Sequence, residues 1–132
     1  MSETVFRRVR GLAAALVILL PRTASYAAEG DAVRGKRVFQ RCYACHSVDP
    51  DETAKLQGPT LSRIMGRPAA AIAGFEYSGA MKMKGVAGLI WDAATLDGYL
   101  ADPEGFVPGT LMSVPPVRDE QERADLIAYL AR

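Results

Sequence analysis

Three residues able to do chemistry stand close together near one third of the way along the chain. Cys42 and Cys45 are separated by two residues, and His46 follows at once; the chain has no other cysteine or histidine. A Cys-x-x-Cys-His segment is typical of covalent haem attachment. Each thiol adds to one vinyl group of the porphyrin, and the imidazole that follows can reach the iron. The motif therefore predicts one haem c held by Cys42 and Cys45, with His46 as an axial ligand of the iron.

Two other uses of a Cys-x-x-Cys pair fit this sequence less well. A redox dithiol of the thioredoxin kind is expected in a βαβ setting, and no strand-like run precedes Cys42. A structural zinc site would need two further Cys or His ligands beyond the motif, and the chain has none. Haem attachment is thus the preferred interpretation.

The first 27 residues have the pattern of a cleavable secretory signal peptide. Basic residues at positions 7, 8 and 10 precede an unbroken apolar run over 12–20. The small-residue site Ser25-Tyr26-Ala27 then fits cleavage before Ala28. The apolar run is short for a membrane span, so retention as a membrane tether is the less favoured alternative. Residues 28–132 remain as one domain.

Composition limits the partners of that domain. Residues 28–132 contain 12 Lys and Arg against 14 Asp and Glu, a net charge of −2. No acidic or basic run suggests a nucleic acid partner. A chain of this size buries only a modest core by itself, and a haem would add the missing hydrophobic bulk.

Helical patterns occur at both ends of the domain and near its middle. The first helix starts at Asp31, a possible N-cap, and runs into Cys42. A second begins at Asp92 and ends before Pro103, and the last begins at Asp119 with Glu122 at the capping-box position. Glycine and proline interrupt 47–79 and 105–117, which we expect to be loops.

An ordered set of motifs extends over nearly all of 30–130, and through it the chain resembles the class I cytochromes c of mitochondria and bacterial periplasm. The segments are Gly35 and Phe39, Cys42–His46, Gly58-Pro59-x-Leu61, Gly66-Arg67, Gly74-Phe75-x-Tyr77-Ser78, Trp91, Tyr99-Leu100, Pro108-Gly109-Thr110-x-Met112 and Asp125–Leu130. The resemblance implies an all-α fold, with helices and loops around one haem and the first and last helices crossing. Gly35 and Phe39 should then pack against Leu126 and Tyr129.

The second axial ligand is left open by residue types alone. Four methionines fall within 28–132, and methionine most often fills gaps in a core. Met112 differs because it lies in a loop stiffened by proline and glycine. The resemblance implies that Met112 is the ligand, while Met65, Met81 and Met83 pack or lie on the surface.

The resemblance also implies the residues around the haem. The Pro59 carbonyl should accept the N–H of His46, and Tyr99 and Thr110 should lie beside Met112. Tyr77 and Trp91 should hydrogen-bond a haem propionate, with Arg67 near it.

Five positions depart from the mitochondrial pattern. Met81 stands where a buried asparagine is frequent, and Val114 where a phenylalanine covers the haem edge. Glu104, Gly105 and Leu111 replace lysines, so the basic ring around the exposed haem edge is thinned.

These features together predict a soluble periplasmic one-electron carrier with a six-coordinate His/Met haem, not an enzyme. As a monomer, it would take electrons from a quinol-oxidising membrane complex and pass them to an oxidase, a reductase or a photosynthetic reaction centre. The alternative is a haem peroxidase or ligand sensor in which Met112 leaves the iron, although the chain has no second histidine to act as an acid or base.

Overall fold

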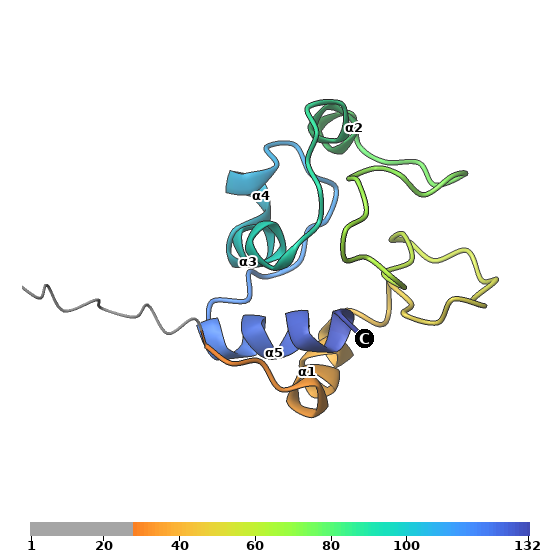
Figure 1. Cartoon of the computed structure of the whole chain (residues 1–132). Coiled ribbons are helices and arrows are strands. Elements are labelled where there is room, and N and C mark those ends of the chain that lie inside the picture. Colours follow the sequence, from red (N-terminus) through yellow and green to blue (C-terminus); the bar gives the residue numbers. More distant parts are fainter. Residues whose placement is uncertain (1–27) are drawn as a thin grey trace, which may run out of the picture.

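The computed structural model describes residues 28–132, and regular structure in that part is helical (Figure 1). In chain order the elements are α1 (Ala32–Val38), the 3₁₀ helix η1 (Phe39–Arg41), α2 (Gly79–Val86), α3 (Ala93–Ala101), α4 (Pro103–Phe106) and α5 (Glu120–Leu130). Within this range there is no strand, only an isolated bridge between Pro68 and Ile90. The all-α prediction is confirmed. None of the described helices is long and apolar enough to cross a membrane. The predicted signal peptide lies outside the described residues.

Aspartates cap the N-termini of α1, α3 and α5, as the sequence predicted. The side chains of Asp31, Asp92 and Asp119 each accept a hydrogen bond, at 2.8 Å, from the backbone N–H three residues on. At Asp92 the cap is reciprocal, because the Thr95 hydroxyl accepts from the Asp92 N–H. Each cap satisfies an N–H that the first turn would otherwise leave without a partner.

The first and last helices cross and touch, as expected (Figure 1). A Cβ on Gly35 would overlap the backbone carbonyl of Asp125 and lie 2.8 Å from the Cβ of Tyr129. The rings of Phe39 and Tyr129 also pack against each other, with their centroids 5.4 Å apart. The missing side chain of Gly35 is therefore what allows the two backbones to meet.

A buried carboxylate locks this crossing. Asp125 is 3% exposed and accepts hydrogen bonds from Arg34 Nε at 2.6 Å and Arg34 Nη2 at 2.8 Å. It also accepts from the backbone N–H of Asp31 at 2.7 Å and from the Gln121 amide. These donors, Arg34 first, hold the pKa of the Asp125 carboxyl well below its usual range.

Some elements differ from the sequence-based expectation. The first helix tightens to 3₁₀ geometry from Phe39 and so does not continue as α-helix into Cys42. Glu122 does not close a capping box, because its carboxylate instead binds Arg41 Nη2 at 2.6 Å. Helices α2 and α4 were not expected.

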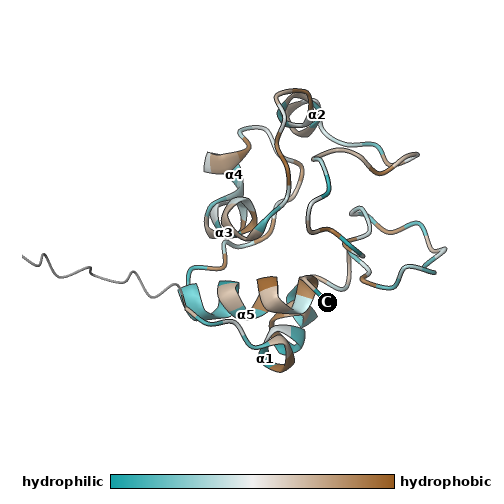
Figure 2. Cartoon of the chain, viewed as in Figure 1, coloured by the Kyte–Doolittle hydropathy of each residue, from teal (hydrophilic) through white to brown (hydrophobic). Residues whose placement is uncertain are grey.

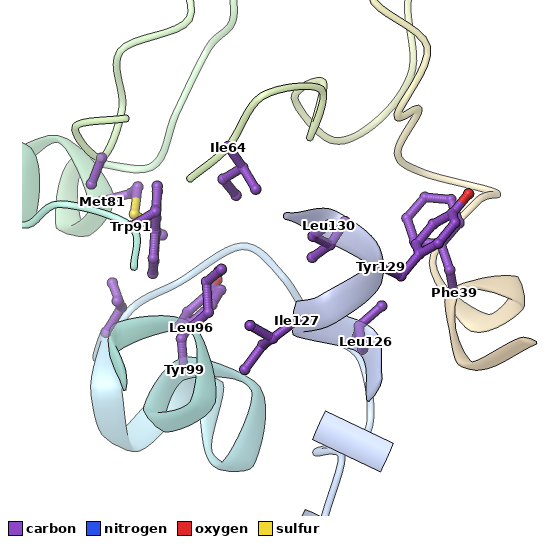
Figure 3. Close-up of a cluster of buried hydrophobic side chains, with 12 residues drawn as sticks. Phe39, Ile64, Met81, Trp91, Leu96, Tyr99, Leu126, Ile127, Tyr129 and Leu130 are labelled. Carbon is purple, nitrogen blue, oxygen red and sulfur yellow. The ribbon is translucent and has the colours of Figure 1, made fainter. Parts of the chain in front are cut away.

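The core lies between α3, α5 and the loops that face them. Figure 3 shows Leu96 and Tyr99 of α3, Ile127 and Leu130 of α5, and the loop residues around one interior region. Hydrophilic residues gather at the N-terminal end of α5 and hydrophobic ones toward its C-terminal end (Figure 2). The buried hydrophobic residues are Phe39, Ile64, Ala69, Met81, Trp91, Leu96, Tyr99, Val107, Leu126, Ile127, Tyr129 and Leu130.

Candidate haem-binding site

The Cys-x-x-Cys-His segment forms one tight turn directly after η1. The backbone N–H groups of Cys45 and His46 both bond the carbonyl of Cys42, at 3.1 and 3.0 Å. Both thiols are half-buried and neither is in a disulfide. The Arg41–Glu122 ion pair ties the preceding residue to α5. One turn thus presents two thiols and an imidazole from an anchored position.

The His46 ring is oriented from one side. Its Nδ1 lies 2.7 Å from the carbonyl oxygen of Pro59, the contact that the resemblance implied. As a hydrogen-bond donor to that carbonyl, Nδ1 keeps the proton and leaves Nε2 with a free lone pair. Burial lowers the pKa of His46, and the Pro59 contact opposes that shift only in part. The ring therefore favours its neutral form, which is the form that binds a metal.

Gly58 makes room for this ring. A Cβ at Gly58 would lie 2.6 Å from Nδ1 and 2.7 Å from Nε2 of His46, closer than atoms of these kinds approach. A side chain at position 58 would push the imidazole aside.

A second group of contacts surrounds Met112. The hydroxyls of Tyr99 and Thr110 are 2.8 Å apart, and the Thr110 hydroxyl accepts the backbone N–H of Met112 at 3.2 Å. Met112 is half-buried and packs against the core. Burial raises the pKa of Tyr99, so its hydroxyl stays protonated and can donate. The structure therefore brings together the three residues expected on this side.

Arg67 and Trp91 form the third group. Arg67 donates to the carbonyls of Thr60 at 2.7 Å and Ser62 at 3.0 Å. The backbones of Arg67 and Trp91 are also joined, since the Trp91 N–H bonds the Arg67 carbonyl at 2.9 Å. Tyr77 accepts the Ile72 N–H at 3.3 Å. Burial raises the pKa of Tyr77, and the nearby guanidinium of Arg67 opposes that rise.

The guanidinium of Arg67 lacks an anionic partner within residues 28–132. Burial lowers its pKa, and its hydrogen bonds there go to neutral carbonyls. Burying part of a cation costs free energy unless an anion lies beside it to offset the charge. A haem propionate is such an anion. The two thiols suit covalent attachment to the vinyl groups of a haem, and the free Nε2 of His46 and the thioether of Met112 are donors that haem iron accepts.

The other methionines behave as core or surface residues. Met81 is buried at 9% exposure, whereas Met83 is 74% exposed. Val114, at 41% exposure, does not enter the core.

Sequence reasoning missed one contact near Met112. The carboxylate of Glu104 accepts the backbone N–H of Gly109 at 3.0 Å. In the sequence Glu104 stands out only as a departure from the family pattern, and no sequence signal reveals a bond that depends on the loop's path.

Known proteins are similar to this chain in both sequence and fold. The family model described as "Cytochrome c" matches residues 32–132. Cytochrome c2 of Rhodomicrobium vannielii is 47% identical over 110 residues, covering 83% of this chain and 84% of that protein. Cytochrome c 2.1 of Caenorhabditis elegans is 45% identical over 102 residues, covering 76% and 87%.

Two solved structures agree with these relatives. Cytochrome cH from Methylobacterium extorquens superimposes with a TM-score of 0.68 at 40% identity, over 76% of this chain and 97% of that one. Cytochrome c2 from Rhodospirillum centenum gives 0.71 at 38% identity, over 76% and 96%. The extent of these matches, together with the single Cys-x-x-Cys-His turn, places the chain in the cytochrome c family, as a c-type electron carrier with one haem c bound through its two cysteines.

Proposed function

We propose that the chain is a soluble periplasmic one-electron carrier whose haem iron lies between His46 and Met112. One observation carries the proposal: the loop over 108–112 holds Met112 half-buried against the core, through the Thr110 hydroxyl that Tyr99 also bonds. The His46 ring, with Nδ1 turned to Pro59, offers Nε2 for the opposite face.

The bound haem supplies a one-electron ferric/ferrous couple. His46 and Met112 would hold the iron from its two faces, which would leave small ligands no open site. A thioether favours ferrous iron, and burial disfavours the extra charge of the ferric state; both effects raise the reduction potential. Arg67, with Tyr77 and Trp91 beside it, offsets the charge of a propionate. These side chains would keep the iron site closed while the iron changes oxidation state. A closed site suits electron transfer, whereas catalysis at the iron needs an open position.

The proposed cellular setting rests on the signal-peptide pattern of residues 1–27 and on the net charge of residues 28–132. We propose that residues 1–27 direct export and are removed, so that the carrier works in the periplasm. Its donor would be a quinol-oxidising membrane complex, and its acceptor an oxidase, a reductase or a photosynthetic reaction centre. With a net charge of −2 after residue 27, any electrostatic steering must come from local patches. Mass measurement of the exported protein should find Ala28 at the N-terminus.

The deciding experiment is the absorption spectrum of the oxidised, haem-loaded protein. The weak red band of sulfur-to-ferric-iron charge transfer should be present, lost in Met112→Ala and retained in Met65→Ala. Met65 is a suitable control because it is also a half-buried methionine packed against the core. A high-spin native spectrum, with carbon monoxide binding readily to the ferrous protein, would instead indicate an open site and a peroxidase or sensor.

A further inference from the structure

We propose that Glu104 is a positioning residue that latches the loop carrying Met112 and so limits how often Met112 leaves the iron. This inference rests on the proposed ligation by Met112.

The geometry places Glu104 opposite the turn of the loop. Helix α4 is capped by Asp102, which accepts the Gly105 N–H at 3.0 Å and so fixes the first turn that contains Glu104. From there the Glu104 carboxylate accepts the N–H of Gly109 at 3.0 Å. Gly109 has φ +86°, a conformation that a residue with a side chain rarely adopts, so the loop turns at the residue that Glu104 holds.

The loop has few other attachments. Within the described part of the chain, residues 108–112 make two hydrogen bonds to side chains outside the loop and its base at Val107: Thr110 to Tyr99, and Gly109 to Glu104. The Thr110 N–H bonds Val107, which is fully buried and forms the fixed base. Tyr99 thus holds the loop from the interior, and Glu104 holds it from the surface.

Among the described residues, no competing cation draws the Glu104 carboxylate away from the Gly109 N–H. Glu104 is the only charged residue over 103–117, and it makes no ion pair in the described structure. A hydrogen bond to a charged acceptor is stronger than a neutral one, although exposure to water reduces its net worth. Loss of the bond should therefore increase the fraction of time that the loop is open by roughly fivefold.

Two conservative variants separate the hydrogen bond from the charge. E104Q removes the charge but keeps an oxygen at the same reach, whereas E104D keeps the charge but is one methylene too short. E104A removes both. The control is E120A, which deletes another exposed first-turn acid, on α5 and outside the loop.

The first readout is the limiting rate at which imidazole binds the oxidised, haem-loaded protein, because at saturating imidazole loop opening sets this rate. We expect E104A and E104D to raise it roughly fivefold, and E120A to leave it unchanged. E104Q, which keeps a weaker neutral hydrogen bond, should raise it by about twofold. Unfolding by guanidinium should shift in E104A by no more than about 1 kcal/mol, which is the same fivefold change converted to free energy. A larger loss of stability would indicate a general structural role for Glu104. Unchanged rates in E104A, or a rise in E104Q without one in E104D, would overturn the latch.

The second readout does not depend on axial ligation. The Gly109 amide hydrogen should exchange with solvent roughly fivefold faster in E104A than in the native ferrous protein, as measured by NMR. If the Gly109 amide exchanged equally fast in E104A and in the native protein, the latch would be refuted, even where the red charge-transfer band shows that Met112 binds the iron. A high-spin native protein in which E104A still speeds Gly109 exchange would refute the Met112 ligation, while the latch itself would stand.

Discussion

The contact between α1 and α5 at Gly35 yields the sharpest prediction for stability. We expect Gly35→Ala to destabilise the haem-loaded protein, because the new methyl group would overlap the Asp125 carbonyl and lie 2.8 Å from the Tyr129 Cβ. The obstacle is backbone, which cannot turn away as a flexible side chain can. The two helices would have to separate.

The magnitude follows from two opposing effects. Overpacking of a well-fitted interface costs about 1–3 kcal/mol, and a backbone obstacle places this site at the upper end. Alanine in place of glycine within a helix returns about 1 kcal/mol. The net loss is then about 2 kcal/mol, or roughly 8–16 °C in Tm for a domain of this size.

The matched control is Gly79→Ala at the start of α2. A Cβ there meets no atom within 4 Å, and the backbone is not left-handed. This variant should range from neutral to about 1 kcal/mol more stable. The assay is guanidinium unfolding of both proteins followed by circular dichroism. A Gly35→Ala protein as stable as Gly79→Ala would refute the close helix approach.

Three further predictions concern single contacts. The pKa of the Asp125 carboxyl is depressed in the folded protein, so the stability it contributes is complete above the ordinary value of 3.8 and is lost as pH falls below it. Acid unfolding should therefore begin at higher pH in Asp125→Asn, and an unchanged acid-unfolding curve would contradict this. Gly58→Ala should displace the His46 ring and weaken its bond to iron, seen as a shifted Soret band and a high-spin fraction; Gly79→Ala should show neither. Thr110→Val should break two hydrogen bonds at 2.8 and 3.2 Å and speed imidazole binding, and a native rate would argue that Tyr99 holds the loop in another way.

Much of the frame could be predicted because it depends on local chemistry. Aspartate at positions 31, 92 and 119 marks a helix start wherever it precedes a helical stretch, and all three caps are present. The crossing of α1 and α5 was implied by the family resemblance, and the missing side chain of Gly35 is what allows it.

The missed helices lack such signals. In α2 only Met81 is buried, while Met83 and Val86 are exposed, so no apolar stripe reveals the helix. Helix α4 is a single turn that starts at a proline, directly where α3 ends. The contact between Glu122 and Arg41 was missed for a similar reason. Arg41 lies on a distant segment of the chain, and the local sequence around Glu122 cannot show that it lies close in space.

The site divides in the same way. The turn of Cys42–His46 and the Pro59 contact depend on short motifs, whereas the bond between Glu104 and Gly109 depends on the path of a loop. The motif and the family resemblance predict the first kind of contact and not the second.

The pairing of α1 with α5 also sets an order of assembly. These helices come from opposite ends of the domain, so their contact closes a loop of most of its length and cannot form before the last helix exists. Arg41, next to Cys42, is anchored by that same helix. Until α5 has docked, the segment that carries the two thiols therefore lacks this anchor.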